Sequence, residues 1–127
     1  MAPGNEKYDV VIIGGAMIGS AIAWFLISNE DFNGTICVIE KDLTFEFAST
    51  SRSNSCIRQQ YSNELNVQIS QYGAEFIRNF KKLIQDDSAP NIILQNFGYL
   101  YLSSSKDSEK VFMEDQAMQA GLGAGTR

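Results

Sequence analysis

The chain has 127 residues, of which 44% are apolar and 11% aromatic, and its 10 basic and 15 acidic side chains give a net charge of −5. This length corresponds to one domain at most, and the composition is that of a folded globular chain rather than a disordered one. The absence of histidine excludes a Ser-His-Asp or Cys-His catalytic centre, a His-ligated metal and imidazole acid–base chemistry in this chain, and the acidic balance argues against a nucleic-acid partner.

The first forty residues predict a strand–helix–strand unit. Residues 8–13 are a run of β-forming side chains, which predicts a strand buried on both faces. Gly14 and Gly15 end that strand, and residues 16–28 predict a helix that is apolar nearly all round. Residues 35–40 predict a second buried strand, and the right-handed crossover rule makes the two strands parallel.

The uncharged stretch 10–29 also passes the length test for a membrane-spanning helix, and its Gly15-x-x-x-Gly19 spacing packs helices in lipid. The stretch opens with four β-branched residues, is broken by two adjacent glycines and lacks flanking positive charge, so we expect no integral membrane span and no secretory signal. Cys37, expected as a small buried strand residue, and Cys56 show no metal-site spacing or disulfide framework. This favours a reducing, cytoplasmic setting.

The second half of the chain predicts a long loop followed by helices and short strands. Residues 41–61 form a polar loop of a length that is uncommon in a compact domain unless it is functional. Apolar residues at steps of three and four predict one amphipathic helix over residues 62–85. The remaining expected elements are strands at residues 92–94 and 99–102 and a helix at residues 107–120 with Gly121 as its C-cap.

A phosphate-binding loop is predicted between the first strand and the first helix. Residues 14–19, Gly-Gly-Ala-Met-Ile-Gly, match the dinucleotide-binding pattern G-x-G/A-x-x-G, in which backbone N–H groups and the helix N-terminus face a diphosphate. Ala16 stands where glycine usually lets the backbone approach the diphosphate, so its methyl group costs some closeness. Glu40 follows Gly19 by 21 positions, and an acid there bonds ribose hydroxyls and repels a 2′-phosphate, which disfavours NADP. The alternative is a tight turn that binds no nucleotide.

Three stretches, YDVVIIGGAMIGSAIAWFL, VIEK and ASTSRSNSCIRQQYS, resemble the D-amino-acid-oxidase-like superfamily of FAD-dependent oxidoreductases, in particular its sarcosine oxidase, glycine oxidase and dimethylglycine dehydrogenase group. The resemblance implies an α/β fold: a Rossmann-type βαβ FAD-binding domain with a parallel sheet over residues 1–90, and the start of an antiparallel substrate-domain sheet over residues 91–127. It implies that the chain is a truncated, N-terminal portion of such an enzyme. The FAD is expected to be non-covalent, because no histidine is present for a covalent link.

The resemblance also implies which residues contact the cofactor and substrate. Ser55-Cys56 stands where many relatives have Gly-Gly, and Cys56 reads either as a neutral contact or as a redox or flavin-linking thiol. Arg58 matches an arginine that binds the substrate carboxylate, with a structural ion pair as the alternative. The implied FAD contacts are Gly14, Gly15, Ala16, Met17, Ile18, Gly19, Glu40, Lys41, Ser49, Thr50, Arg52, Ser53, Ser55 and Cys56.

The function implied is FAD-dependent oxidation of a C–N bond in a small amino acid or N-methyl amine by hydride transfer to the flavin. No catalytic side chain and no metal site are expected in this segment, and the remainder of the enzyme or a partner chain would complete the fold. Two alternatives stay open: an NAD-dependent dehydrogenase domain, and a non-catalytic nucleotide-binding or assembly subunit. The sequence identifies neither the substrate nor the electron acceptor.

Overall fold

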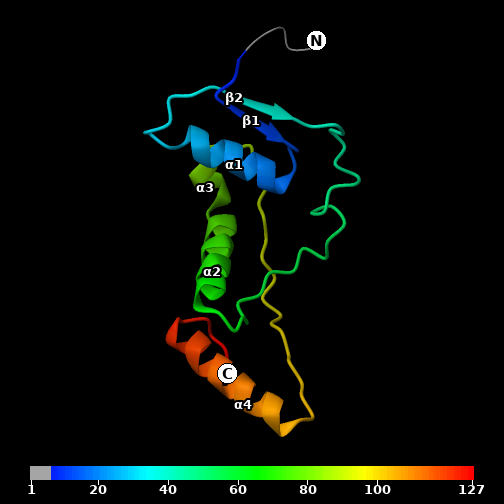
Figure 1. Ribbon diagram of the computed structural model, residues 1–127, viewed down its shortest axis with the longest axis vertical. Helices are drawn as coiled ribbons and strands as arrows, with labels where there is room; N and C mark the ends of the chain where they lie inside the picture. Colours follow the sequence, from blue (N-terminus) through cyan, green and yellow to red (C-terminus); the bar gives the residue numbers. More distant parts are fainter. Residues whose placement is uncertain (1–6) are drawn as a thin grey trace. The chain divides into compact units, whose positions relative to one another are not determined.

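The computed structural model describes residues 7–127, so residues 1–6, where the first expected domain begins, lie outside the described residues. The chain divides into two compact units, one ending at Ser55 and the other running from Cys56 to Arg127, and each is described by itself (Figure 1). The expected boundary between two domains at residue 90 stays a prediction.

The first unit is a parallel βαβ arrangement, which confirms the prediction for this part of the chain. Its elements are β1 (Val10–Ile13), α1 (Met17–Ile27) and β2 (Ile36–Ile39). The two strands pair in parallel, with Val10 opposite Ile36 and Ile13 opposite Ile39. Each element is shorter than predicted by one or two residues at its ends. Figure 1 shows α1 running beside the strand pair that it connects.

A hydrogen-bonded clamp fixes the register where the two strands begin. The carboxylate oxygen Oδ2 of Asp9 accepts hydrogen bonds from the backbone N–H of Thr35 at 2.7 Å and from its hydroxyl at 2.8 Å. These bonds, the backbone one above all, lower the pKa of Asp9 below its ordinary value of 3.8. At the other end of the pair, the Gly14 N–H donates to the carbonyl of Ile39 at 2.8 Å. The loop after β1 therefore starts from a fixed point beside the end of β2.

The expectation that both strands are buried on both faces is wrong for the described unit. Ile12 is 8% exposed, whereas Ile13 is 87% and Val38 is 44% exposed. Cys37, expected to be buried, is half-buried. The physical reason is that α1 covers one face of the strand pair, and no second layer covers the other face within the described residues of this unit. A strand needs a layer on each side to be buried on both faces.

The second unit contains three helices, α2 (Glu64–Arg78), α3 (Phe80–Ile84) and α4 (Lys106–Gly121). The single helix predicted over residues 62–85 is interrupted at Asn79. Its side-chain amide donates to the backbone carbonyl of Glu75 at 3.1 Å and to the Glu75 carboxylate at 2.5 Å. Asparagine side chains compete in this way for the carbonyls that a continuous helix would use, so the helix stops and restarts.

The two short strands expected at residues 92–94 and 99–102 are not formed, and residues 91–104 contain no helix or strand. A strand must pair its backbone groups with a neighbour, and the one sheet among the described residues consists of β1 and β2. The start of an antiparallel sheet is therefore not present in this structure.

The helix predicted near residues 107–120 is confirmed as α4, but its cap glycine is not Gly121, which lies in the last turn. Gly123 takes the left-handed conformation, with φ at +77°, and its N–H donates to the carbonyl of Ala120 at 2.9 Å. Gln119 of α4 is 3% exposed, and its side-chain amide donates to the backbone carbonyl of Tyr61 at 2.9 Å. None of the helices in residues 7–127 has the length and apolar character needed to cross a membrane.

Candidate dinucleotide-binding site

The glycine loop joins β1 to α1 with very little space between the two elements. Gly14 has a φ of +100°, a conformation that L side chains rarely adopt. Gly19 is buried in the first turns of α1, and a β-carbon built on it would lie 1.7 Å from the carbonyl oxygen of Gly14. Both glycines are therefore required by the backbone itself, and together they bring the start of α1 against the end of β1.

The N-terminus of α1 has no capping side chain, in contrast to the two other long helices. Asn63 caps α2 by accepting from the N–H of Asn66 at 3.3 Å, and Ser105 caps α4 by accepting from the N–H of Ser108 at 3.1 Å. The residue before α1 is Ala16, which offers no such acceptor, and the first turn of α1 carries no acidic side chain. The first N–H groups of a helix carry partial positive charge, so this helix start is open to an anion such as a diphosphate.

Glu40 lies directly after β2 and contacts the glycine loop. Its Oε2 accepts from the N–H of Gly15 at 2.7 Å, and its Oε1 accepts from the N–H of Asp42 at 2.9 Å. These bonds, first that from Asp42 and then that from Gly15, lower the pKa of Glu40 below its ordinary value of 4.5. An ionised carboxylate has about four acceptor positions, so two backbone donors leave acceptors for ribose hydroxyls.

Sequence reasoning missed two residues that support this loop. The hydroxyl of Ser20 donates to the carbonyl of Gly15 at 2.5 Å, and the backbone of Asp42 holds one oxygen of Glu40. Ser20 follows the predicted site residue Gly19 by one position, and Asp42 follows Glu40 by two. This closeness in sequence was the only signal that could have identified them. The loop, the uncapped helix start and Glu40 fit a dinucleotide, with the diphosphate at α1 and a ribose at Glu40.

Ala16 offers a direct test of how closely the backbone must approach the diphosphate. Its φ of −70° and ψ of −164° are open to any L residue, so glycine is not required there for conformational reasons. We expect Ala16→Gly to tighten FAD binding by about threefold through closer approach, and Ala16→Val to weaken it by about tenfold or more through crowding. Flavin fluorescence titration of the apoprotein measures both, and equal affinities for the three proteins would contradict a diphosphate at this position.

The predicted loop contacts at residues 49–55 are exposed and bonded mainly to one another. The Arg52 guanidinium lies 4.5 Å from the ring centroid of Phe47, and its Nε donates to the carbonyl of Glu46 at 3.3 Å. The Ser53 hydroxyl donates to the carbonyl of Thr50 at 2.9 Å. Ser49 and Lys41 are exposed as well. Arg52, Ser53 and Ser55 are hydrogen-bonded to residues 46–53 and not to residues 14–19, so the structure does not bring these two groups of predicted site residues together.

Ser55 and Cys56 stand at the boundary between the two units. Ser55 has a φ of +51°, in the left-handed region that favours glycine, which gives a physical reason why glycine suits this position. Cys56 belongs to the second unit, where the hydrogen bond between its thiol and the Tyr99 hydroxyl is the main cause that raises the pKa of Tyr99. The structure thus gives Cys56 a polar contact with a tyrosine.

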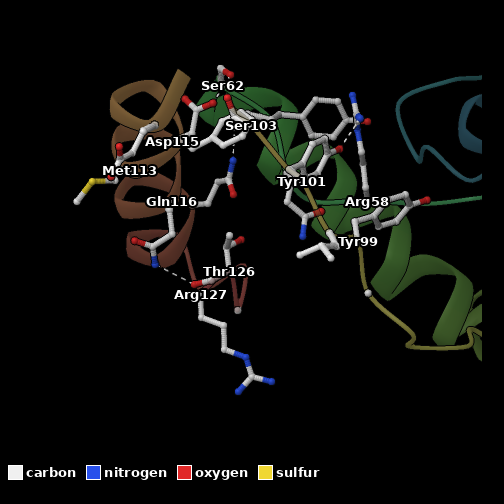
Figure 2. A pocket seen from close by; sticks show the side chains of 18 of the residues that line it. Arg58, Ser62, Tyr99, Tyr101, Ser103, Met113, Asp115, Gln116, Thr126 and Arg127 are labelled. Atoms are coloured by element: carbon white, nitrogen blue, oxygen red, sulfur yellow. Dashed lines mark hydrogen bonds between the residues drawn. The ribbon is translucent and has the colours of Figure 1, made fainter. Parts of the chain in front are cut away.

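Arg58 lines an open cavity of about 1160 Å³ within the second unit (Figure 2). Its Nη1 donates to the hydroxyl oxygen of Tyr101 at 2.6 Å, and its guanidinium carbon lies 4.8 Å from the ring centroid of Tyr61. Hydrogen bonding to Tyr61, and then the charge interaction with Tyr101, raise the pKa of Arg58. The two ion pairs found among residues 7–127 lie on exposed helix surfaces and do not include Arg58, so the structural ion pair considered as an alternative is absent from that range.

Sequence reasoning also missed Tyr61, Tyr99 and Tyr101 as neighbours of Arg58 and Cys56. A signal for two of them existed, because Tyr99 and Tyr101 alternate with leucines and so point to the same side of an extended chain. What the sequence could not supply was the partner that they face.

Comparison with known proteins gives a consistent result. A family model described as FAD dependent oxidoreductase matches residues 9–127. The chain is 36% identical over 124 residues to FAD-dependent oxidoreductase domain-containing protein 1 of Xenopus laevis and 37% identical over 123 residues to the Bos taurus protein of the same name, covering 94% of this chain in each case. The Drosophila melanogaster homologue is 32% identical over 116 residues, or 91% of the chain. The chain spans about a quarter of the length of these relatives, 24% and 25% of the first two. No solved structure matches it significantly.

Proposed function

The chain belongs to the family of FAD-dependent oxidoreductases, and on that premise we propose that it supplies the cofactor-binding part of an enzyme that oxidises a C–N bond in a small amino acid or N-methyl amine. The observation that carries the cofactor side of this proposal is the hydrogen bond of 2.7 Å between Glu40 and the Gly15 N–H beside an uncapped α1. The uncapped start of α1 presents N–H donors to the diphosphate of a dinucleotide, and the Glu40 carboxylate presents acceptors to its ribose hydroxyls.

The residues of this chain would hold FAD in two places. The N–H groups at the start of α1 bind the diphosphate, and the free acceptor positions of Glu40 bind the ribose hydroxyls of the adenosine. We assign the hydroxyls of residues 49–55 and the Arg52 guanidinium to further polar contacts with the cofactor, because hydroxyls and guanidinium groups suit a diphosphate. FAD, when bound, supplies a two-electron acceptor for the hydride of a C–H bond next to nitrogen.

Arg58 is the residue that we assign to the substrate. Its guanidinium is exposed, lines the cavity of the second unit and, among residues 7–127, contacts tyrosines and forms no ion pair with an acid. A guanidinium without an acidic partner keeps its charge available for a carboxylate, which it can bind through two parallel hydrogen bonds. This supports an amino acid, rather than a simple amine, as the substrate. The chain has no histidine, which is compatible with this reaction because a neutral amine needs no protein base.

The proposal is tested with the purified protein and two cofactors. We expect FAD to bind and to give the absorption of protein-bound flavin, and NADH to leave the protein unchanged. We then expect anaerobic addition of N-methylglycine or a related N-methyl amino acid to bleach the flavin absorption, since hydride transfer reduces it. Preferential NADH binding would favour the NAD-dependent dehydrogenase alternative. Bound flavin that no amine or amino acid reduces would contradict the oxidase or dehydrogenase role and favour a non-catalytic binding or assembly subunit.

Two further points stay proposals. Because this chain spans about a quarter of its curated relatives, we propose that the remainder of a longer enzyme, or a partner chain, completes the site. We propose a reducing, cytoplasmic setting because the two cysteines have neither metal-site spacing nor a disulfide framework in the sequence.

A further inference from the structure

The Tyr101 hydroxyl accepts a hydrogen bond from the Arg58 guanidinium. We propose that Tyr101 is a positioning residue, which presents Arg58 to the carboxylate of the substrate. This inference rests on the proposed function, because it takes Arg58 as the carboxylate-binding residue. Tyr101 is not among the site residues that the sequence predicts.

Three contacts restrict the guanidinium. Its Nη1 donates to the Tyr101 hydroxyl oxygen at 2.6 Å (Figure 2). Its central carbon lies 4.8 Å from the ring centroid of Tyr61 and 5.9 Å from that of Tyr101. A guanidinium is attracted to the faces of aromatic rings at such distances. The guanidinium is thus hydrogen-bonded to tyrosine and flanked by two rings, although the Arg58 side chain remains exposed.

Tyr101 itself is held by α4. Its ring centroid lies 6.3 Å from that of Phe112, with the two ring planes at 67°, an edge-to-face arrangement that aromatic pairs prefer. Residues 91–104 form no strand, so this side-chain contact, together with the bond to Arg58, anchors Tyr101 in place of a sheet. The position of the Tyr101 hydroxyl therefore depends on the contact with Phe112 of α4 rather than on strand pairing of residues 91–104.

The charge of Arg58 stays available within this arrangement. A guanidinium carries five N–H donors, and its hydrogen bonds to Tyr101 and Tyr61 leave further donors free for a ligand. Two acids, Glu109 and Asp115, also line the cavity, but the Asp115 carboxylate accepts a hydrogen bond from the Ser62 hydroxyl, and neither acid forms an ion pair with Arg58 among the described residues. A long side chain that is already ordered loses less conformational entropy when it binds a ligand, so orienting Arg58 in advance favours carboxylate binding.

The experiment compares a carboxylate with its neutral amide. Acetate and acetamide are titrated into the FAD-loaded protein and followed by ligand-observed NMR, which gives the Kd of each. The test variant is Tyr101→Phe, which removes the hydroxyl and keeps the ring against Phe112. We expect the Kd for acetate to rise by about threefold to tenfold and the Kd for acetamide to stay unchanged, because one hydrogen bond to the guanidinium is lost.

Two other variants make the result specific. Tyr72→Phe removes the hydroxyl of an exposed tyrosine on α2, outside the cavity, and should leave both Kd values unchanged. Tyr101→Gln restores an acceptor oxygen without the ring and should recover part of the acetate affinity. Because this comparison is between two ligands on the same protein, a general loss of structure would move both Kd values and would not imitate the expected result.

The outcomes separate the two proposals. If Arg58→Lys abolishes the preference for acetate and Tyr101→Phe behaves as the unmodified protein, Arg58 binds carboxylates and Tyr101 does not position it. If the unmodified protein shows no preference for acetate, or Arg58→Lys leaves that preference intact, Arg58 is not the carboxylate-binding residue and both assignments fail.

Discussion

Gly19→Ala should eliminate FAD binding, with an affinity at least about 100-fold below that of the unmodified protein, and should lower the free energy of unfolding by about 3 kcal/mol. The added β-carbon would lie 1.7 Å from the Gly14 carbonyl oxygen and 3.2 Å from Cγ2 of Ile12. Neither neighbour can yield easily, since the Gly14 N–H is bonded to Ile39 and Ile12 is buried. To relieve the overlap, α1 must move away from β1, which takes its N-terminal N–H groups away from the diphosphate.

Gly73→Ala is the matched control for this substitution. Gly73 lies within α2, and a β-carbon built on it meets no atom within 4 Å. Alanine is a better helix former than glycine, so this variant should gain about 0.5–1 kcal/mol of stability and bind FAD as before. Urea unfolding and the flavin absorption retained after gel filtration measure both properties. If Gly19→Ala retained flavin as well as Gly73→Ala, close contact of α1 with β1 would not be what the cofactor requires.

The parts of the structure that were predicted correctly are those decided by local sequence. The run of β-formers, the two glycines and the apolar helix predict the βαβ unit, because each element is specified within about a dozen residues and the crossover rule supplies the strand direction. The position of Glu40 also follows from local sequence, since its place at the end of β2 puts it beside the loop that follows β1. Gly14 is required by its positive φ and Gly19 by the close approach of α1 to β1, and both requirements are visible in the sequence because only glycine meets them.

The parts that were not predicted depend on distant partners. Tyr99 and Tyr101 alternate as strand residues do, but a strand forms only with a neighbour, and in the described chain their side chains contact Cys56, Arg58 and Phe112 instead. The apolar residues of β1 predicted a strand covered on both faces, which is wrong for this structure. Burial depends on which layers pack against the strand, and the sequence of the strand does not specify those layers. The interruption at Asn79 was missed for a different reason, since apolar periodicity continues through it while one side-chain amide competes for a helix carbonyl.

Glu40→Gln should weaken FAD binding by about tenfold to 100-fold, because both oxygens of the Glu40 carboxylate act as hydrogen-bond acceptors. This is the second largest effect that we expect. Its two oxygens accept from opposite backbone donors, Oε2 from Gly15 and Oε1 from Asp42. A glutamine has only one acceptor oxygen, so its NH₂ group must face one of these N–H donors, and fewer acceptor positions remain for the ribose. Glu30→Gln, which changes an exposed acid of the same unit, is the control and should leave the affinity unchanged.

The pH dependence of FAD binding gives an independent test of the same carboxylate. The backbone donors lower the pKa of Glu40 below 4.5, so the group is ionised at neutral pH and its contribution to affinity is fully present above that value. As the pH falls through the lowered pKa of the folded protein, protonation converts one acceptor into a donor, and the affinity should fall with it. The difference in affinity between the unmodified protein and Glu40→Gln should therefore be constant above about pH 5 and should narrow at lower pH. A difference that stays constant down to acid pH would mean that the charge of Glu40 does not take part in holding the ribose.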